Sequence, residues 1–386
     1  MNKIEKLIKQ YCPDGVEFKK LGDCGKVVRG NRVTKSQLKD DKKYPVISGG
    51  SKPLGYFDEY NREPKTITIA QYGSAGYLDW QNEKFWANDV CYSVYPNKEL
   101  NNRFLFFILS NQQNYIYSLK TNAIPAHLPQ NLLEKIQIPI PPLPIQEEIV
   151  NILDKFTELE AELEAELEAR THQYEFYRNE LLAFENKEVE WKTLGEVGTF
   201  IRGTGLQKSD FTESGIGCIH YGQIYTYYGS ATTETKSFVS EELAKKLRKA
   251  KKGDLIIAGV SENIVDICKA VVWLGEDDIC ISGDSSAFRH NQNPKYIGYL
   301  FRTNRFLEFK KKYVQGAKVT RLRSGSLPTF TIPIPPLEEQ ERIVNILDQF
   351  DALLNDIKVG LPAEIQARKQ QYEHYRSKLL TFTTVN

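Results

Sequence analysis

The chain has 386 residues, 41% of them hydrophobic and 11% aromatic, and a formal net charge of +1 at pH 7. A chain of this length needs more than one hydrophobic core, so we expect at least two domains, and the composition excludes a disordered protein. The near-zero net charge excludes a uniformly basic nucleic-acid binder, so any such surface has to be a local patch. The acid that balances such a patch is concentrated in the glutamate-rich segment 157–170.

The cysteines, histidines and apolar runs indicate neither a metal centre nor a membrane span. The six cysteines form no C-x-x-C pair, and the N-terminal residues MNKIEKLIKQ have no signal-peptide pattern, so we expect reduced thiols in a soluble, cytoplasmic protein. No apolar run approaches the roughly 18 residues of a membrane-spanning helix. Cys218 and His220 would share a strand face, but two ligands do not make a metal site, and packing explains them.

Both halves of the chain start with the same element. Residues 1–12 have the periodicity of a short amphipathic helix, which Pro-Asp-Gly at 13–15 ends. The following residues, 16–35, read VEFKKLGDCGKVVRGNRVTK, and residues 189–208 read VEWKTLGEVGTFIRGTGLQK. This internal repeat indicates two copies of one structural unit.

The middles of the two halves differ. The first contains the runs YPVISGG, TITIAQYGSAG and NDVCYSVYP, and the second contains IGCIHYGQIYTYYGS, GDLIIAGVS and AVVWLG. Short β-rich runs divided by Gly, Pro and Asn are typical of twisted strands and turns. Only the basic run 245–252 of the second half looks helical in this region. Similar ends with different middles are explained by a shared scaffold that carries two different recognition surfaces.

Both halves also end with the same stretch, over residues 138–156 and 332–350, which are identical at 15 of 19 positions. Each copy is a proline-rich extended piece that leads into an amphipathic helix. A helix over 146–184 would be about 58 Å long and has little to bury alone, so we expect the two helices to pack antiparallel. The predicted helix–helix seam consists of Ile149, Leu153, Phe156, Leu159, Leu163, Leu167, Ile343, Leu347, Phe350 and Leu354.

The two long helices differ in length and in their middle. The tails 173–184 and 371–382 match at an offset of 198, so the second helix holds about one extra turn, roughly 6 Å. Pro362 predicts a kink there or the start of a new segment. The first helix instead carries three ELEA tetrapeptides, which are either a spacer or an ordinary exposed helix of good helix formers. The leucines on the seam favour the spacer.

Recognisable catalytic motifs are absent from the sequence. It contains no G-x-x-x-x-G-K-[ST] loop, no G-x-G-x-x-G after a strand, no H-E-x-x-H and no Asn/Asp-Pro-Pro-aromatic methyltransferase signature. Acidic pairs are frequent but lie at solvent-facing helix positions. We therefore predict no catalytic residue, no metal site and no cofactor in this chain.

Basic loops that contain glycine are the candidate binding sites. Arg, Lys, Asn and Ser on flexible loops near Tyr suit phosphates and base edges, and the loop GAKVTRLRSG favours DNA most clearly. For RGNRVTK and GTGLQK a repeated structural turn is an equally good interpretation, and run 245–252 is as consistent with a solvated helix face as with DNA contact. The predicted DNA-contacting residues are Arg29, Asn31, Arg32, Lys35, Tyr72, Ser74, Arg202, Lys208, Tyr221, Gln223, Lys318, Arg321 and Arg323.

At the repeated IPIPPL and Q-x-x-I-V-x-I-L-D motifs, the chain resembles the specificity subunit of type I restriction–modification systems. The resemblance covers essentially the whole length, including the duplicated helices, the V-E-[FW]-K-x-L-G-[DE] starts and the phrases YPVISGG and TITIAQYGSAG. It implies that each variable half is a target recognition domain, and that the two helices set the distance between two half-sites in double-stranded DNA. It also implies a non-catalytic chain that holds two modification subunits, which carry S-adenosylmethionine and methylate adenine. Restriction subunits that use ATP and Mg are the other implied partners.

The expected fold class is α+β, with two mixed α/β domains, two long antiparallel coiled-coil helices and an internal pseudo-twofold repeat. We place target recognition domains at 1–145 and 185–337 and the conserved spacer helices at 146–184 and 338–386. The resemblance implies that the N-terminal helix packs near the C-terminal one in a circular arrangement. Pro144, where the second copy has Glu338, predicts that the two long helices start differently.

Other functions remain open from sequence alone. A two-domain adaptor for proteins or glycans predicts no salt-sensitive DNA binding, even with partners present. A nuclease with an unrecognised site predicts metal-dependent activity of the purified chain. A specificity subunit whose partners are fused or missing would be silent.

Overall fold

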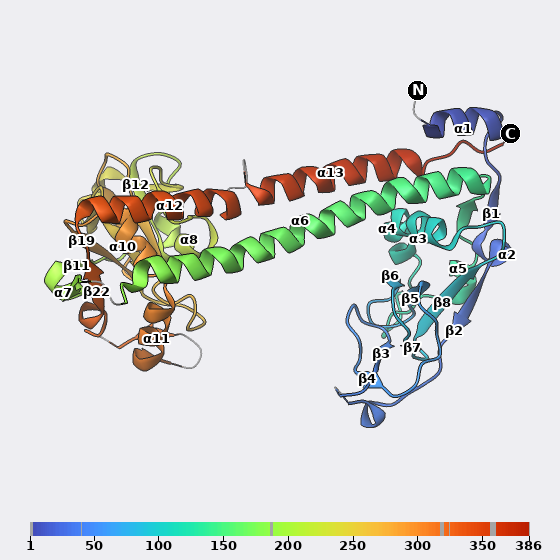
Figure 1. Cartoon of the computed structure of the whole chain (residues 1–386), viewed down its shortest axis with the longest axis horizontal. Coiled ribbons are helices and arrows are strands. Elements are labelled where there is room, and N and C mark those ends of the chain that lie inside the picture. Colours follow the sequence, from blue (N-terminus) through green and yellow to red (C-terminus); the bar gives the residue numbers. More distant parts are fainter. Residues whose placement is uncertain are drawn as a thin grey trace. The chain divides into compact units, whose positions relative to one another are not determined.

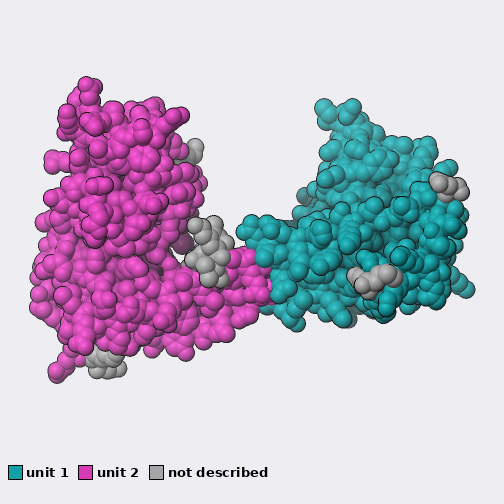
Figure 2. Space-filling model, turned by 90° about the horizontal axis from the view of Figure 1, so that it is seen from above, with its two compact units in different colours: residues 1–162, 365–386 teal, residues 163–364 magenta. Residues whose placement is uncertain are grey.

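The computed structural model describes residues 3–39, 41–185, 188–316, 320–323, 325–355 and 360–385 (Figure 1). The chain forms two compact units, one of residues 1–162 and 365–386 and the other of residues 163–364 (Figure 2). Each unit combines a globular domain of strands and short helices with parts of the two long helical segments. The predicted α+β fold class is confirmed.

The first unit is built on a four-stranded antiparallel sheet with the strand order β2–β8–β5–β6. Strand β5 is buried at every position, because the sheet is covered on both faces. The globular part contains α1 (Lys3–Tyr11), β1 (Phe18–Lys20), α2 (Leu21–Cys24), β2 (Gly25–Arg29), η1 (Lys35–Gln37), β3 (Tyr44–Ile47), β4 (Tyr56–Phe57), β5 (Thr66–Ala70), β6 (Leu78–Gln81), β7 (Trp86–Ala87), β8 (Cys91–Pro96), α3 (Asn102–Asn111), α4 (Gln113–Ser118), α5 (Gln130–Leu133) and β9 (Gln137–Pro139).

The second unit repeats this sheet as β11–β19–β16–β17, adds the parallel strand β13, and carries a second sheet ordered β14–β12–β18–β15. Its globular part contains β10 (Glu190–Thr193), α7 (Leu194–Val197), β11 (Gly198–Arg202), η2 (Lys208–Asp210), β12 (Ile216–Ile219), α8 (Tyr221–Thr226), β13 (Ala231–Thr232), β14 (Ser237–Val239), α9 (Glu241–Ala244), β15 (Lys249–Ala250), β16 (Leu255–Ala258), β17 (Ala270–Trp273), β18 (Ile279–Ile281), β19 (Ser285–His290), α10 (Pro294–Leu300), α11 (Asn304–Tyr313), β20 (Val314–Gln315), β21 (Arg321–Leu322), η3 (Leu327–Thr329) and β22 (Thr331–Ile334).

The basic run 245–252 is not a helix, so that prediction is wrong. Helix α9 ends at Ala244, and β15 pairs with β18 through the register Ala250↔Ile279. Ala244, Leu247 and Ala250 are all buried at a helical spacing of three, which explains the misleading pattern. Pairing with a distant strand overrides this local preference.

The two proline-rich stretches close each domain at its base. Strand β1 pairs antiparallel with β9, with Phe18 opposite Pro139, and β10 pairs with β22, with Trp191 opposite Pro333. The same register therefore recurs in both units. Proline fits here because each ladder has only two strands, so its N–H-deficient position can face away from the partner. The strand that enters a domain is thus fastened to the strand that leaves it.

Two long helical segments follow these strands. Helix α6 (Leu143–Ala183) extends from the first unit into the second, and the other segment consists of α12 (Leu337–Asn355) and α13 (Leu361–Leu379). Pro362 lies in the first turn of α13, where proline is tolerated, so the predicted start of a new segment is confirmed. Pro144 lies in the first turn of α6 in the same way. Since α6 and α12 begin at equivalent residues, the predicted difference between the two helix starts is wrong.

In the first unit α6 packs antiparallel to α13. The ring of Phe156 lies 5.4 Å from that of Tyr375 and 6.4 Å from that of Tyr372. Further along α6, the carboxylate of Glu160 pairs with Lys369, at 3.3 Å. The residue numbers rise on one helix as they fall on the other, which defines the antiparallel direction.

In the second unit the same aromatic contact is made by the repeated residues. The ring of Phe350 on α12 lies 6.1 Å from that of Tyr174 and 5.9 Å from that of Tyr177 on α6. Each long helical segment therefore uses one phenylalanine and two tyrosines in the same way. The internal sequence repeat therefore gives matching side-chain contacts in the two units.

Most residues of the predicted seam are packed in the cores of the two units. Ile149 and Leu153 are fully buried in the core of the first unit, and Ile343 and Leu347 are buried in that of the second. Leu159 is 44% exposed, and its place in the seam stays a prediction. Phe156 packs against α13 in the first unit, and Leu163, Leu167, Phe350 and Leu354 are packed in the second.

The two ends of the chain meet within the first unit (Figure 1). Val16 forms a parallel bridge with Thr384, and its N–H donates to the carbonyl of Thr383 at 2.8 Å. Ile4 of α1 is buried in the same core as Leu379 at the end of α13. The packing of the N-terminal helix near the C-terminal one is confirmed. None of the helices in the described ranges has an apolar stretch of the length and hydropathy that a bilayer crossing requires.

Candidate nucleic-acid interface

In the first unit, Arg29 ends β2 and begins the first predicted basic loop. Its Nε donates a hydrogen bond to the carbonyl oxygen of Asp89, at 2.5 Å. At the next residue, Gly30, a Cβ atom would lie 2.2 Å from the carbonyl oxygen of Asn88, so only glycine allows the two loops to approach this closely. The other predicted residues of this loop are all exposed: Asn31, Arg32 and Lys35.

Asn88 connects this loop to its neighbours, although no sequence pattern selected it. Its side chain is buried, and its Oδ1 accepts hydrogen bonds from the N–H groups of Val33 at 3.0 Å and Asp89 at 2.9 Å. Its Nδ2 donates to the Oγ of Ser48, at 3.4 Å. The one available signal was an asparagine placed directly between two strands, β7 and β8.

The loop that carries Tyr72 and Ser74 lies against the loop after β3. The N–H of Ser74 donates to the carbonyl of Gly49 at 2.7 Å, and a Cβ atom on Gly49 would lie 2.3 Å from the carbonyl oxygen of Tyr72. Tyr72 stacks on His127, with ring centroids 5.3 Å apart, and is half-buried, whereas Ser74 is exposed. The predicted residues of the first unit thus lie on adjoining loops, connected through the segment 48–50.

The second unit has the same arginine–glycine turn at Arg202 and Gly203 as the first has at Arg29 and Gly30. The Nε of Arg202 donates to the carbonyl of Gly283 at 3.3 Å, and a Cβ atom on Gly203 would lie 2.1 Å from the carbonyl oxygen of Ser282. The shared Arg-Gly pair therefore marks a structural turn in both halves. DNA contact by the outer ends of Arg29 and Arg202, both exposed, stays a prediction.

Three predicted arginines come together in the second unit. A cavity of about 340 Å³ is lined in part by Arg202, Arg321, Arg323 and Asp284. Arg321 and Arg323 are exposed, and a guanidinium nitrogen of Arg321 lies 3.6 Å from the carboxylate of Asp284. The sequence pattern indicated each arginine, but neither their convergence nor the acidic partner. Lys318 lies outside the described residues.

A basic turn around Arg248 adjoins the loop that follows Arg202 and contains Thr204. The N–H of Arg248 donates to the Oγ1 of Thr204 at 3.1 Å, and its carbonyl accepts from Ile281 at 3.1 Å. Lys208 is exposed on η2, which follows Thr204 in the chain. The exposed cations of run 245–252 are Lys245, Lys246, Arg248, Lys251 and Lys252.

Gln223 has a structural role in this arrangement. Its side chain is 8% exposed, its Oε1 accepts from the N–H of His220 at 3.0 Å, and its Nε2 donates to the Oγ of Ser237 at 2.7 Å. A base contact would require breaking this cap of α8. Tyr221 is half-buried beside the His220 ring, with centroids 4.5 Å apart, and keeps part of its surface exposed.

The thiols of both units are core groups. Burial raises the pKa of Cys91, Cys218 and Cys268 to about 12. These side chains are therefore protonated and unreactive near neutral pH. Within the ranges that the structure describes, no three His, Cys, Asp or Glu side chains converge as ligands of a metal ion would.

The geometry defines a class of protein in which one scaffold, used twice, presents two unlike sets of basic loops. The family model described as the type I restriction modification DNA specificity domain matches residues 13–169 and 186–367. The chain belongs to this family of type I restriction–modification specificity subunits.

Similar proteins span the same length. A putative type I restriction enzyme specificity subunit of Haemophilus influenzae is 33% identical, over 95% of this chain and 96% of that protein. The type I restriction enzyme EcoR124I/EcoR124II specificity subunit of Escherichia coli is 31% identical, over 99% of this chain and 97% of that protein.

Solved structures show the same fold. The S subunit of a type I restriction–modification system from M. genitalium has a TM-score of 0.60 at 18% identity, over 96% of this chain and 97% of that one. A chain from work on complex assembly and conformational transition of the type I R-M system has a TM-score of 0.61 at 16% identity, over 95% of this chain and 98% of that one.

Proposed function

We propose that this chain is a non-catalytic subunit that recognises a split, asymmetric sequence in double-stranded DNA. One domain binds each half-site, and the long helices set the gap between the half-sites. Two modification subunits then methylate adenine, and restriction subunits cleave. S-adenosylmethionine, ATP and Mg belong to those partners in this proposal.

The observation that carries the proposal is the contrast between a repeated frame and unlike loops. The two-stranded base of each domain keeps one register, and the arginine–glycine turn recurs at Arg29 and Arg202. The surrounding loops do not recur: the first unit offers Tyr72 and Ser74, and the second offers the cavity with Arg321 and Arg323. Two surfaces on the same frame, with different loops, are suited to two different half-sites. Base contacts specify sequence, while phosphate contacts position the domain.

The modest net charge is compatible with this role. Exposed cations lie on the loops of the candidate interface, and the glutamate-rich segment 157–170 lies on α6. Local basic patches are sufficient to neutralise a few phosphates at each half-site. The proposal therefore needs no uniformly basic chain.

Selection from a random duplex library tests the proposal. The complex of this chain with its modification subunits is expected to enrich a two-part motif with unlike halves. Because phosphate and base contacts are lost, Arg321→Ala with Arg323→Ala is expected to lower affinity for the enriched duplex at least about tenfold and to reduce the salt slope by about two.

Arg170→Ala with Arg342→Ala is the matched control, since it removes the same charge from exposed positions on α6 and α12 in the same unit, outside the candidate interface. We expect this variant to change affinity less than about twofold, in line with screening of distant surface charge. Equal losses of affinity in both variants would mean that the arginines contribute only non-specific electrostatic attraction. No enrichment of any sequence by the wild-type complex would favour the adaptor hypothesis.

A further inference from the structure

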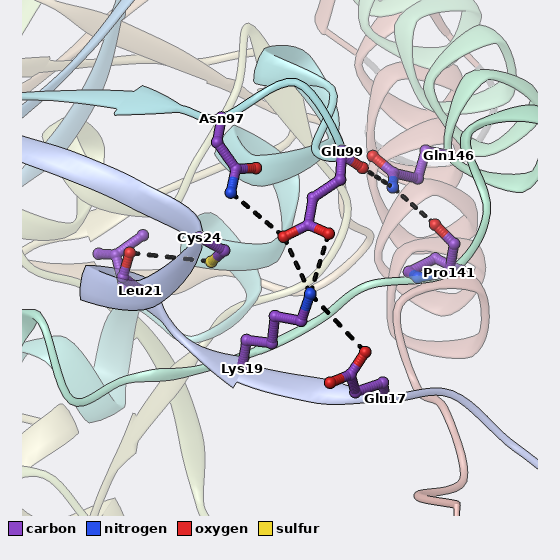
Figure 3. A network of polar contacts seen from close by, with 8 residues as sticks. All are labelled: Glu17, Lys19, Leu21, Cys24, Asn97, Glu99, Pro141 and Gln146. Carbon is purple, nitrogen blue, oxygen red and sulfur yellow. Dashed lines mark hydrogen bonds and ion pairs between the residues drawn. The ribbon is translucent and has the colours of Figure 1, made fainter.

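A buried glutamine joins α6 to the first domain. Gln146 lies in the first turn of α6 and is fully buried. Its Nε2 donates to the carbonyl oxygens of Pro141 at 2.6 Å and Glu99 at 3.0 Å (Figure 3). Its Oε1 accepts from the N–H of Asn101, at 2.7 Å. Both donors and the acceptor of the amide are therefore used, and two of the three bonds go to the domain.

The second unit contains the same junction. Gln340 in the first turn of α12 is also fully buried. Its Oε1 accepts from the N–H of Asn293 at 3.0 Å, and its Nε2 donates to the carbonyl of Pro335 at 2.9 Å and to the Oε1 of Gln292 at 2.8 Å. The domains differ in their exposed loops, yet this internal junction is preserved.

In both units the glutamine holds the residue that caps a domain helix. The side chain of Asn101 accepts from the first N–H groups of α3, and that of Asn293 does the same for α10. The amide of the long helix thus binds the backbone of the capping residue, whose side chain is already fixed. A shift of the long helix would have to break this chain of hydrogen bonds.

A second link lies further along each long helix. Asp154 pairs with Arg103 at 2.8 Å, and Asp348 pairs with Lys295 at 2.6 Å. Each link lies eight residues after its glutamine, which is about 12 Å along a helix. Two attachment points at this distance fix the direction of the helix relative to its domain.

In the first unit the loop that receives Gln146 is also held from its other side. Glu99 pairs with Lys19 of β1 at 2.9 Å and accepts from the side chain of Asn97 at 3.2 Å (Figure 3). The Lys19 ammonium lies 3.7 Å from Glu17 as well. The glutamine therefore binds to a fixed part of the domain.

We infer that Gln146 and Gln340 are positioning residues that fix the direction in which each long helix leaves its domain. The fixed direction of the helix within each unit does not depend on the proposed function, but its consequence for DNA does. There, the fixed direction makes the complex selective for one gap length between the half-sites. A methionine of similar length keeps the volume but none of the hydrogen bonds, so it separates direction from packing.

Spin-label distances in the full chain test this inference. Labels at Glu59→Cys and Ala161→Cys report on the domain and on α6 within the first unit, and both sites are exposed. The six native cysteines are buried and will not compete for the label. We expect a narrow distance distribution with Gln146 and one at least twofold broader with Gln146→Met.

Gln113→Met is the matched control. Gln113 also makes two hydrogen bonds to backbone groups, accepting from Leu78 and donating to Gly76, but both lie inside the domain. It should lower the melting temperature while leaving the distribution narrow. An equally narrow distribution in Gln146→Met and the control would overturn the inference.

The second unit provides an independent arm. Gln340→Met is measured with labels at Ala352→Cys on α12 and Glu276→Cys in the domain, both exposed. It decides the question if Gln146→Met does not fold. If neither variant folds, the glutamines act in overall stability and the positioning role is overturned.

Methylation of duplexes whose gap is changed by one base pair connects the junction to function. The wild-type complex should reject the altered gaps, and Gln146→Met should lose at least tenfold of this discrimination with unchanged half-site preferences. An equal loss on all duplexes would contradict the positioning role. A wild-type complex without any gap preference would instead count against the proposed function.

Discussion

Gly203 shows how one missing side chain brings two loops of the second unit together. A Cβ atom there would lie 2.1 Å from the carbonyl oxygen of Ser282, and backbone cannot move as easily as a flexible side chain. The same contact exists at Gly30 in the first unit, where the nearest carbonyl oxygen would lie 2.2 Å away. The arginine that precedes each glycine is placed by this close approach.

Gly203→Ala is therefore expected to destabilise the second unit by about 1–3 kcal/mol, the usual range for overpacking. Gly205→Ala is the matched control, because a Cβ atom there meets nothing within 4 Å. It should change stability by less than about 0.5 kcal/mol. Urea midpoints of the two variants check this prediction, and equal midpoints would contradict it.

His290 should make the second unit sensitive to acid. Burial lowers the pKa of His290 from 6.5 to about 4, and its Nε2 is buried without a hydrogen-bond partner among the described residues. The neutral ring is thus favoured in the folded state, and the unfolded chain takes up the proton first. The stability that results is present above pH 6.5 and is lost as the pH falls towards 4, by about 3 kcal/mol in total.

His290→Asn removes the titration while retaining an acceptor for the N–H of Gln292, which bonds the Nδ1 of His290 at 3.2 Å. Urea unfolding of the second unit at several pH values between 7 and 4 checks the prediction. The wild-type midpoint should fall more steeply than that of the variant. Parallel curves would show that His290 does not contribute to the acid response.

At the scale of elements, the spacing of apolar residues predicted the helices whose formation depends on local sequence. The long helices followed from the apolar spacing of residues such as Ile149 and Leu153, both fully buried in the structure. The same rule failed for run 245–252, because pairing of β15 with β18 is a contact between residues distant in the sequence. Leu159 has the same spacing but is 44% exposed, since burial depends on how much of the helix a partner covers.

The candidate interface was predictable only by residue type. Exposed Arg, Lys and Asn near glycine identified Arg29 and Arg321, which are both exposed, at the end of β2 and the start of β21. Asn88 and Gln146 were missed, since their partners are tens of residues away and a buried amide has no local signature. Gln223 was selected by type, although its amide is used inside the fold.

The ELEA tetrapeptides give a prediction for α6 as an element. Deleting one of them shortens the helix by about 6 Å. Under the proposed function, this should change the gap between the half-sites by one or two base pairs, at about 3.4 Å per pair, and leave both half-sites unaltered. Methylation mapping with the deletion variant checks it. Altered half-sites with an unchanged gap would contradict a spacer role.

At the scale of the whole molecule, duplication determines the architecture. Each unit repeats one sheet order, one strand register at its base, one aromatic contact between long helices and one buried glutamine. The chain ends meet in the first unit through Val16 and Thr384, where the second unit has a continuous chain. The frame is thus the same in both units, and the differences are concentrated in the loops of the candidate interface.

The central claim is that this one chain directs methylation to a two-part target, and a map of N6-methyladenine tests it most directly. DNA is compared from cells that express the modification subunits with and without this chain. The account predicts a split motif with unlike halves that appears only when the chain is present. No new methylation, with the same modification subunits active beside another specificity subunit, would contradict it.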